Sequence, residues 1–225
     1  MTRPAHERRR IDLIVFDFDG TLCDSADVKT DAFYDLYLEE HGPDFAARVK
    51  DHHLANVGAS RYEKIRYLET EVLGNRPGDA EVGVIASRYS VLVEQAVVDA
   101  PLFDGVAEFL ATPHPGVTYT VASATPTDEL RRIVDRKGLA ERFAAIEGSP
   151  RSKAAILGEC VERFAAGPHS AVIVGDQPSD AEAAVAVGTG AIVITPPAPW
   201  TEPFERFDDF PAAAACLRER MSVRS

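Results

Sequence analysis

The sequence predicts a doubly wound α/β protein with an all-helical segment inserted after its first strand. Residues 11–16 form an apolar, β-branched run that is typical of a buried strand. From residue 101 onward, short apolar strands alternate with helical patterns, which favours parallel strands joined by right-handed crossovers. Between these two parts, residues 24–99 show helical periodicity and no convincing strand.

The composition is that of a globular protein and limits its partners. The chain has 225 residues, long enough to bury a core, and a formal net charge of -12. This charge argues against nucleic acid or an anionic membrane as the main partner, and an anionic substrate would then need a local cation or metal. The cysteines fit neither a disulfide framework nor a zinc site, and the first ten residues lack the apolar region of a signal peptide. We therefore expect a cytoplasmic monomer or homodimer without a transmembrane helix.

The helical insertion is expected to span residues 25–98, which leaves residues 1–24 and 99–225 as the α/β core. Its first helix should end near residues 41–43, and residues 44–54 form a second candidate. Ser60 and Glu63 have the spacing of a capping box and open a third helix that should stop at Gly74. In the fourth helix, residues 79–98, the expected inward-facing side chains are Val84, Ile85, Tyr89, Leu92 and Val93.

The core elements follow the same rules of periodicity and of glycine and proline punctuation. After the first strand, the expected strands are residues 116–122, 143–146, 170–174 and 191–194. The expected helices are residues 106–110, 127–137, 152–164, 181–187 and 212–220.

The first strand runs directly into Asp17-Phe18-Asp19-Gly20-Thr21. Because side chains alternate along a strand, Asp17 and Asp19 begin on one side, at the strand's carboxyl end. That edge of an open α/β sheet is where ligands bind. Two carboxylates this close repel each other unless a cation or a shared proton relieves them. Gly20 allows the sharp turn that follows.

These residues, together with Leu22, resemble the first motif of the haloacid dehalogenase-like phosphohydrolase superfamily. The resemblance implies that Asp17 is a nucleophile that forms an aspartyl-phosphate, that Asp19 is a general acid/base, and that Mg2+ lies between them. The chemistry agrees, since one carboxylate can attack phosphorus while another carboxyl group protonates the leaving oxygen. Mg2+ prefers oxygen ligands and offsets phosphoryl charge. Gly20 and Thr21 of this motif are expected to contact the substrate.

Two further strand ends resemble the second and third motifs of this superfamily. Ser123 ends a strand and precedes Ala124, and a hydroxyl and an N–H at such a turn can hold a phosphate oxygen, although a serine there is also a common helix cap. Lys153 lies at a helix start, where the dipole disfavours a cation, so a functional partner is expected. The resemblance implies that Lys153 holds the nucleophile and phosphate. Arg151 competes for this role, because the usual Lys-Pro pair is replaced by Lys153-Ala154.

Gly175-Asp176 and Asp180 follow another strand and resemble the fourth motif. They add anionic oxygen to the same sheet edge, although acidic residues at a helix start are also ordinary. The resemblance implies direct metal ligation by Asp176 and a supporting place for Asp180, bridging to Lys153. The expected metal-site residues are therefore Asp17, Asp19 through its carbonyl oxygen, Asp176 and Asp180.

In this superfamily an insertion after the first motif is a mobile cap of the C1 type, and the cap decides the substrate. Arg61 and Lys64 are neighbours on one helix face near its start. They could receive a second anionic group of the substrate, such as a carboxylate or phosphate. The other interpretation, two solvated surface cations, is equally open.

The leading hypothesis is a Mg2+-dependent phosphatase of a small phosphorylated metabolite, similar to phosphoglycolate phosphatases. A dehalogenase is disfavoured, because halide displacement does not need the acid/base Asp19. A phosphonate hydrolase would need a Schiff-base lysine from the cap, for which Lys29, Lys50 and Lys64 are available. A β-phosphoglucomutase-like phosphomutase shares all four motifs. A non-catalytic phosphate-binding protein would have been free to lose at least one motif residue, and all are present.

Overall fold

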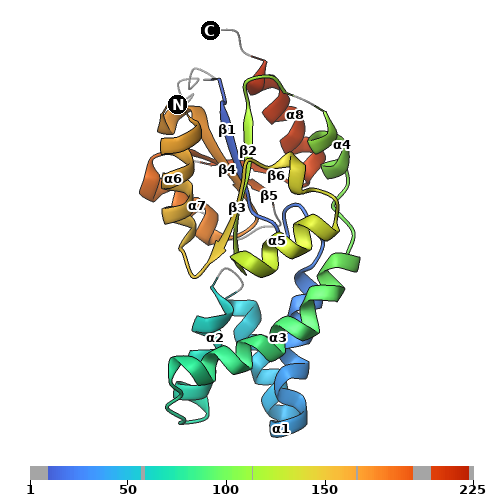
Figure 1. Ribbon diagram of the computed structural model, residues 1–225, viewed down its shortest axis with the longest axis vertical. Coiled ribbons are helices and arrows are strands. Elements are labelled where there is room, and N and C mark those ends of the chain that lie inside the picture. Colours follow the sequence, from blue (N-terminus) through green and yellow to red (C-terminus); the bar gives the residue numbers. More distant parts are fainter. Residues whose placement is uncertain (1–9, 57–58, 113, 166, 195–203, 223–225) are drawn as a thin grey trace, which may run out of the picture.

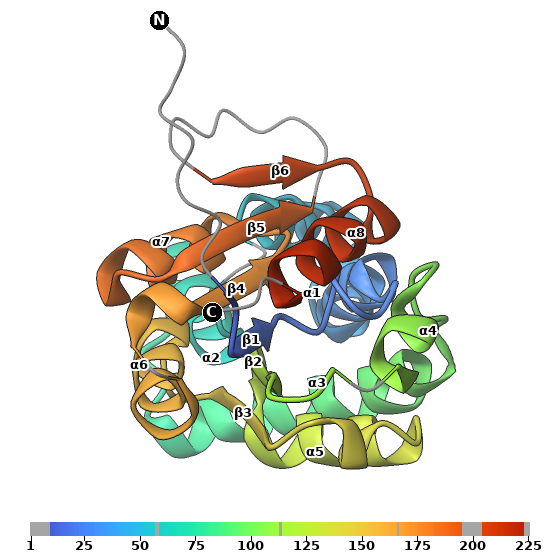
Figure 2. The ribbon, with the colours of Figure 1, turned by 90° about the horizontal axis from the view of Figure 1, so that it is seen from above.

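A six-stranded parallel sheet forms the centre of the molecule (Figures 1 and 2). The computed structural model describes residues 10–56, 59–112, 114–165, 167–194 and 204–222. The strands, in the order in which they lie side by side, are β3 (Ala145–Ser149), β2 (Thr118–Pro126), β1 (Leu13–Phe16), β4 (Ala171–Gly175), β5 (Gly190–Ile194) and β6 (Glu205–Phe207). All five strand pairs are parallel. The predicted doubly wound α/β class is confirmed.

Helices cover both faces of this sheet, because the central strands are apolar on both sides. Ile14 and Phe16 of β1 face one side, where α4 (Val106–Ala111), α5 (Thr127–Arg136) and α8 (Phe210–Met221) pack. Leu13 and Val15 face the other side, against α6 (Lys153–Phe164) and α7 (Pro178–Val187). Because β1 ends at Phe16, the next residue, Asp17, lies at the carboxyl edge of a strand that is buried along its whole length.

Three further helices lie beyond the carboxyl ends of the strands (Figure 1). They are α1 (Ala26–Ala55), α2 (Arg61–Tyr67), which continues into a π-helical turn (Leu68–Val72), and α3 (Asp79–Asp99). The chain leaves the sheet region and returns to it side by side, since the Asp24 N–H donates to the Pro101 carbonyl at 2.9 Å and the Phe103 N–H donates to the Leu22 carbonyl at 3.1 Å. The insertion is thus joined to the sheet through two adjacent connections.

The helix end and the capping box that the sequence predicts for the inserted helices are both present in the structure. The expected helix end near residues 41–43 is a kink at Gly42, whose φ of 77° interrupts the helical run, and the expected second segment continues as the rest of α1. Before α2, the Ser60 hydroxyl accepts from the Glu63 N–H, and the Glu63 carboxylate accepts from the Ser60 N–H at 2.8 Å, so the capping box is confirmed.

Several element predictions were wrong in detail. On α3, Val84 and Leu92 are exposed, and the buried stripe consists of Val82, Ala86, Tyr89, Val93 and Val97. The third strand in the chain begins at residue 145 rather than 143, and α7 begins at Pro178, three residues early. The short edge strand β6 was not predicted, because its three residues are largely polar and pair only with β5. The early start of α7 has a local cause, since Pro178 occupies its first position and the Gln177 N–H donates to the Asp180 carboxylate.

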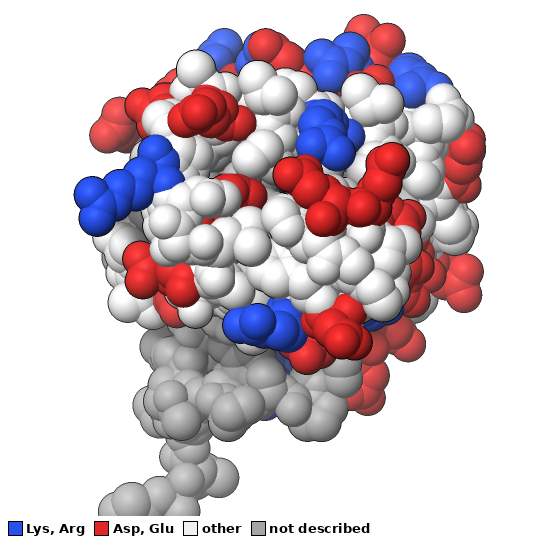
Figure 3. Space-filling view, turned by 90° about the horizontal axis from the view of Figure 1, so that it is seen from below, with Lys and Arg blue, Asp and Glu red and all other residues white. Residues whose placement is uncertain are grey.

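The face formed by α1 to α3 carries acidic and basic side chains interspersed among uncharged ones (Figure 3). In the part of the chain that the structure describes, no helix combines the length and hydrophobicity needed to cross a membrane. Residues 1–9, on which the expectation about a signal peptide rests, lie outside the described residues.

Candidate active site

Asp17 and Lys153 meet at the centre of the sheet's carboxyl edge. The Lys153 ammonium donates to Asp17 Oδ2 at 2.7 Å and to Asp180 Oδ1 at 2.6 Å, and all three side chains are buried. The other Asp17 oxygen accepts from the Phe18 N–H at 2.7 Å. Lys153 stands at the first position of α6, behind the cap Ser152, so the helix start aims its side chain into the site. These contacts fix the Asp17 carboxylate in one orientation.

Lys153, not Arg151, occupies the place beside Asp17. The Arg151 guanidinium is bound instead by Glu159 and lies 3.9 Å from Glu147, outside the carboxylate cluster. The absence of proline after Lys153 has therefore not displaced the lysine from this edge.

Asp176 completes a cluster of three carboxylates. One oxygen each from Asp17, Asp176 and Asp180 can be chosen so that all lie within 4.8 Å of one another. Asp176 Oδ1 accepts from the Thr21 hydroxyl at 3.0 Å. Gly20 has a φ of 79°, and a Cβ there would lie 2.5 Å from Asp176 Oδ2, so only glycine fits this close approach.

The electrostatics of this cluster fit a divalent cation. Burial raises the pKa of Asp17 to about 7, against the opposing Lys153 ammonium, and burial together with Asp17 raises the pKa of Asp176 to about 6. Burial also raises the pKa of Asp180. Burial makes the charged form of these carboxyl groups costly, a bound cation would offset that cost, and carboxylate oxygens are the ligands that Mg2+ prefers. The residues present therefore fit Mg2+. Asp180 is already engaged by Lys153 and by the Gln177 N–H, which suits it to support rather than to direct ligation.

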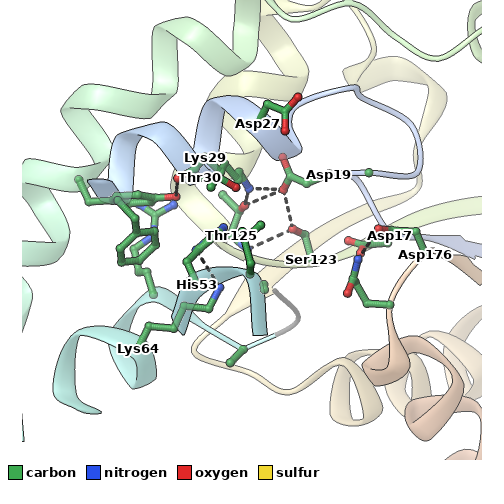
Figure 4. Close-up of a pocket in the computed structure, with 18 of the residues that line it drawn as sticks. Asp17, Asp19, Asp27, Lys29, Thr30, His53, Lys64, Ser123, Thr125 and Asp176 are labelled. Carbon is green, nitrogen blue, oxygen red and sulfur yellow. Dashed lines mark hydrogen bonds and ion pairs between the residues drawn. The ribbon is translucent and has the colours of Figure 1, made fainter. Parts of the chain in front are cut away.

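The Asp19 side chain points away from this cluster, toward the inserted helices (Figure 4). Its carboxylate accepts from the Ser25 hydroxyl at 2.6 Å and the Thr125 hydroxyl at 3.0 Å, and it contacts the Lys29 ammonium of α1. Burial would raise the pKa of Asp19, but Lys29 and these hydroxyl groups outweigh it and hold the pKa below its ordinary value. Asp19 thus carries a negative charge in this arrangement.

Ser123 lies in the last part of β2, near the Asp19 carboxylate. Its hydroxyl lies 3.5 Å from Asp19 Oδ2 and accepts from the Thr125 N–H at 3.1 Å. Ser123 and Ala124 both line the cavity that opens from the carboxylate cluster. The sequence placed both residues at this edge but did not identify Thr125, which also binds Lys29 at 2.7 Å.

A cavity of about 110 Å3 extends from this edge toward α1, α2 and α3. Asp17 and Asp176 lie on one side of it, and His53 and Lys64 lie on the other (Figure 4). A more open groove of about 850 Å3 shares Ser123 and Lys153 with the cavity and runs between the starts of α2, α6 and α7. The carboxylate edge is thus reached from two directions.

Arg61 and Lys64 both line the cavity, so neither is a solvated surface cation. The Arg61 guanidinium forms a bidentate pair with Glu129 of α5, with both N–O distances 2.6 Å. Lys64 lies 3.3 Å from Nδ1 of the buried His53. Of the other lysines considered for a Schiff base, Lys50 pairs with Asp31 on the surface and does not line this cavity. Nothing in the sequence distinguished Glu129 from an ordinary first-turn acidic residue.

The comparisons with known proteins agree with this geometry. The family model for haloacid dehalogenase-like hydrolases matches residues 11–188, and the chain belongs to this family. Within it, the chain is 27% identical over 187 residues to phosphoglycolate phosphatase of Synechococcus elongatus, covering 81% of this chain and 82% of that protein.

A second relative has a different named activity. The chain is 30% identical over 190 residues to the tyrosine-protein kinase PtkA of Mycobacterium tuberculosis, covering 81% of this chain but only 61% of the length of PtkA. Among solved structures, the hydrolase YfnB of Bacillus subtilis, bound to magnesium, superposes with a TM-score of 0.69 at 17% identity, over 93% of this chain and 100% of that one. The family model thus places the chain among the haloacid dehalogenase-like hydrolases, and the solved structure shows that the two chains share a fold.

Proposed function

We propose that this protein is a Mg2+-dependent phosphatase that hydrolyses a small phosphate monoester through an aspartyl-phosphate on Asp17. The observation that carries the proposal is the buried contact of Lys153 with Asp17, next to Asp176 and Asp180. A carboxylate held in one orientation by an ammonium group is suited to attack phosphorus, because it is already oriented before the reaction begins.

In the first step, an Asp17 oxygen forms a bond to phosphorus while the bond to the leaving oxygen breaks. Ser123, the Ala124 N–H and Lys153 would hold the phosphoryl oxygens, with Gly20 and Thr21 shaping the same edge. Asp19, which is ionised while Lys29 holds it, would turn from Lys29 and take a proton from solvent, and it would then give that proton to the leaving oxygen. In the second step Asp19 would take a proton from the water that attacks the aspartyl-phosphate, which restores both carboxyl groups.

Asp17, Asp176 and the Asp19 carbonyl group would hold Mg2+, with Asp180 in support. When bound, the ion would offset negative charge on the phosphoryl group and on the carboxylate cluster. The magnesium-bound relative supports this assignment by analogy alone.

We further propose that residues 25–98 act as a C1-type cap that closes over the substrate in the cytoplasm of the cell. The two adjacent connections at Asp24 and Pro101 would serve as its hinge. The small cavity between the cap helices and the sheet favours a small metabolite, and the net charge of -12 disfavours nucleic acid and anionic membranes as partners.

A second candidate is phosphoryl transfer from Asp17 to an acceptor hydroxyl group instead of water. The similarity to a tyrosine kinase and the open groove beside Ser123 and Lys153 favour this candidate, because the groove gives a second molecule access to the same centre. A phosphomutase would use the same step with a sugar phosphate as acceptor.

The testing experiment measures phosphate release from a panel of esters that includes phosphoglycolate, sugar phosphates, nucleoside monophosphates and an aryl phosphate. Each ester is incubated with Mg2+, with a chelator, and with the Asp17→Asn variant. Turnover that requires both Mg2+ and Asp17 supports the phosphatase. Loss of ester without phosphate release, with the phosphoryl group recovered on a tyrosine peptide or sugar, supports the transferase. A folded protein that does neither contradicts both.

A further inference from the structure

The cavity wall formed by the inserted helices contains three cations, Lys29, Arg61 and Lys64, which would normally indicate a site for an anionic group. In this structure two of these three cations are paired with a carboxylate. Lys29 contacts Asp19, Arg61 is paired with Glu129, and Asp27 adds a further carboxylate to the cavity wall. The wall therefore has little net positive charge to offer a second anion.

The Arg61–Glu129 pair is the strongest of these interactions. It has two N–O distances of 2.6 Å, a third hydrogen bond from Arg61 to the Ser90 hydroxyl at 2.5 Å, and side chains only 4% and 3% exposed. The guanidinium also lies 4.6 Å from the centre of the Tyr89 ring. A substrate anion that recruited Arg61 would leave the Glu129 carboxylate buried and unpaired, which is a strongly unfavourable exchange.

Of the remaining basic groups on this wall, His53 is neutral and Lys64 is only partly protonated at neutral pH. Burial lowers the pKa of His53 to about 3, so the ring is neutral, and burial next to Lys29 lowers the pKa of Lys64 to about 7. The side chains between them are apolar or aromatic, namely Phe33, Leu54, Ala59 and Tyr89. A wall of this kind suits an alcohol that has no charge of its own.

We propose that Glu129 determines the specificity of this pocket by holding the Arg61 guanidinium, so that the enzyme selects small phosphate esters of uncharged alcohols over esters whose alcohol carries a carboxylate or a second phosphate. This inference rests on the proposed phosphatase function. Glu129 lies in the first turn of α5, which begins directly after the β2 residues Ser123 to Pro126, so the junction of strand and helix fixes its position relative to the phosphoryl site.

The test compares two esters of equal length, 2-hydroxyethyl phosphate and phosphoglycolate. The first ends in a hydroxymethyl group and the second in a carboxylate. The ratio of their kcat/KM values is measured with Mg2+ for the wild type and for Glu129→Gln. We expect the wild type to prefer 2-hydroxyethyl phosphate. Glu129→Gln keeps the shape but uncovers the Arg61 charge, so the ratio should shift toward phosphoglycolate by about tenfold or more.

Three variants separate specificity from damage to the fold. Adding Arg61→Met to Glu129→Gln removes the uncovered charge and should return the preference to the uncharged ester. Glu129→Asp keeps the carboxylate and should keep the wild-type preference. Glu94→Gln removes a different carboxylate, which is paired with Arg132 of α5. Neither Glu94 nor Arg132 lines the cavity, so this variant should leave the ratio unchanged.

A wild-type preference for phosphoglycolate that is lost in Lys64→Met would overturn the proposal, because Lys64 would then be an anion receptor. An unchanged ratio in folded Glu129→Gln would also overturn it. If only the aryl phosphate is turned over, the two esters are compared as competitive inhibitors. If no ester is turned over, the phosphatase proposal fails, and equilibrium binding of the two esters to the Mg2+-loaded protein still decides the role of Glu129.

Discussion

The ammonium group of Lys153 lies 2.7 Å from the Asp17 carboxylate and is shared with Asp180, which stands on another helix. With the neighbouring Asp176 included, the cluster holds three carboxylates and one ammonium group, which leaves two negative charges when all of them are ionised. A divalent cation balances that excess. The same lysine that orients the nucleophile therefore also defines the charge of the ion that the cluster accepts.

Lys153→Met should remove nearly all activity and destabilise the protein without added metal. The side chain keeps most of its length, but Asp17 and Asp180 lose their buried partner, and removing one member of such a pair costs about 3–5 kcal/mol. Activity and urea unfolding in chelator measure both effects. Arg151→Met is the matched control, because Arg151 pairs with exposed Glu159 outside the cluster, and its loss should cost less than about 1 kcal/mol. Equal effects of the two substitutions would contradict this assignment.

Asp17 should make the metal-free protein less stable as pH rises, compared with Asp17→Asn. Its pKa is raised to about 7 in the folded protein from 3.8, so the folded state binds the extra proton across this interval. The stabilisation that this proton gives the folded state is complete below pH 3.8 and is lost as the pH rises through about 7. Asp17→Asn should therefore gain stability relative to the wild type by a few kcal/mol across this interval, since one pKa unit corresponds to about 1.4 kcal/mol.

Urea unfolding of both proteins in chelator across this pH interval checks the prediction. Comparing the two proteins cancels the opposite contribution of His53, whose pKa is lowered to about 3. Adding Mg2+ should reverse the pH dependence of wild-type stability, because the ion competes with protons for the carboxylates. Thermal stabilisation by Mg2+ should therefore grow as pH rises. A stability difference independent of pH would show that Asp17 is not protonated in the folded protein.

Gly20→Ala should weaken metal binding more than it weakens folding. The new Cβ would lie 2.5 Å from Asp176 Oδ2 and would push this carboxylate away, while the positive φ costs about 1–2 kcal/mol. Calorimetric titration with Mg2+ measures the loss of affinity, which we expect to be about tenfold or more. Gly138→Ala is a control with a similar φ of 70° and no atom near the added Cβ. If both variants bind Mg2+ like the wild type, Asp176 does not hold the ion.

Arg61→Met should destabilise the protein by about 3–5 kcal/mol, whereas Arg132→Met should cost less than about 1 kcal/mol. Both arginines pair with a glutamate across the contact between α5 and the inserted helices, but the Arg61–Glu129 pair is buried and the Arg132–Glu94 pair is partly exposed. Urea unfolding of the two variants gives the comparison. Similar small losses would mean that the Glu129 carboxylate exchanges Arg61 for water at little cost.

The sheet and the motif residues at its edge could be predicted, because short-range patterns determine both. An apolar run ends where its strand ends, so Asp17, Ser123 and Asp176 could be assigned to one edge from local spacing alone. The start of β3 and the inward face of α3 could not be predicted, because the same periodic pattern fits more than one choice of first residue or of buried face. Contacts with other elements choose among them, and they bury Val82 rather than Val84.

The partners of the charged cavity residues were also beyond prediction. Glu129 lies 68 residues from Arg61, and Thr125 lies 106 residues from Asp19, so no local pattern joins them. The sequence showed that Arg61 and Lys64 share a helix face, but the neighbour that occupies Arg61 depends on how α2 packs against α5. Charge alone could not indicate that this cation is already paired.

The most direct test of this account is chemical trapping of the phosphorylated nucleophile. The protein is mixed with Mg2+ and its best ester, quenched during turnover, treated with borohydride and digested for mass spectrometry. An aspartyl-phosphate is reduced to homoserine, and we predict this change at position 17 only, absent in chelator and in Lys153→Met. Homoserine at another aspartate, or rapid turnover with unmodified Asp17 under all quench times, would contradict the central role of Asp17.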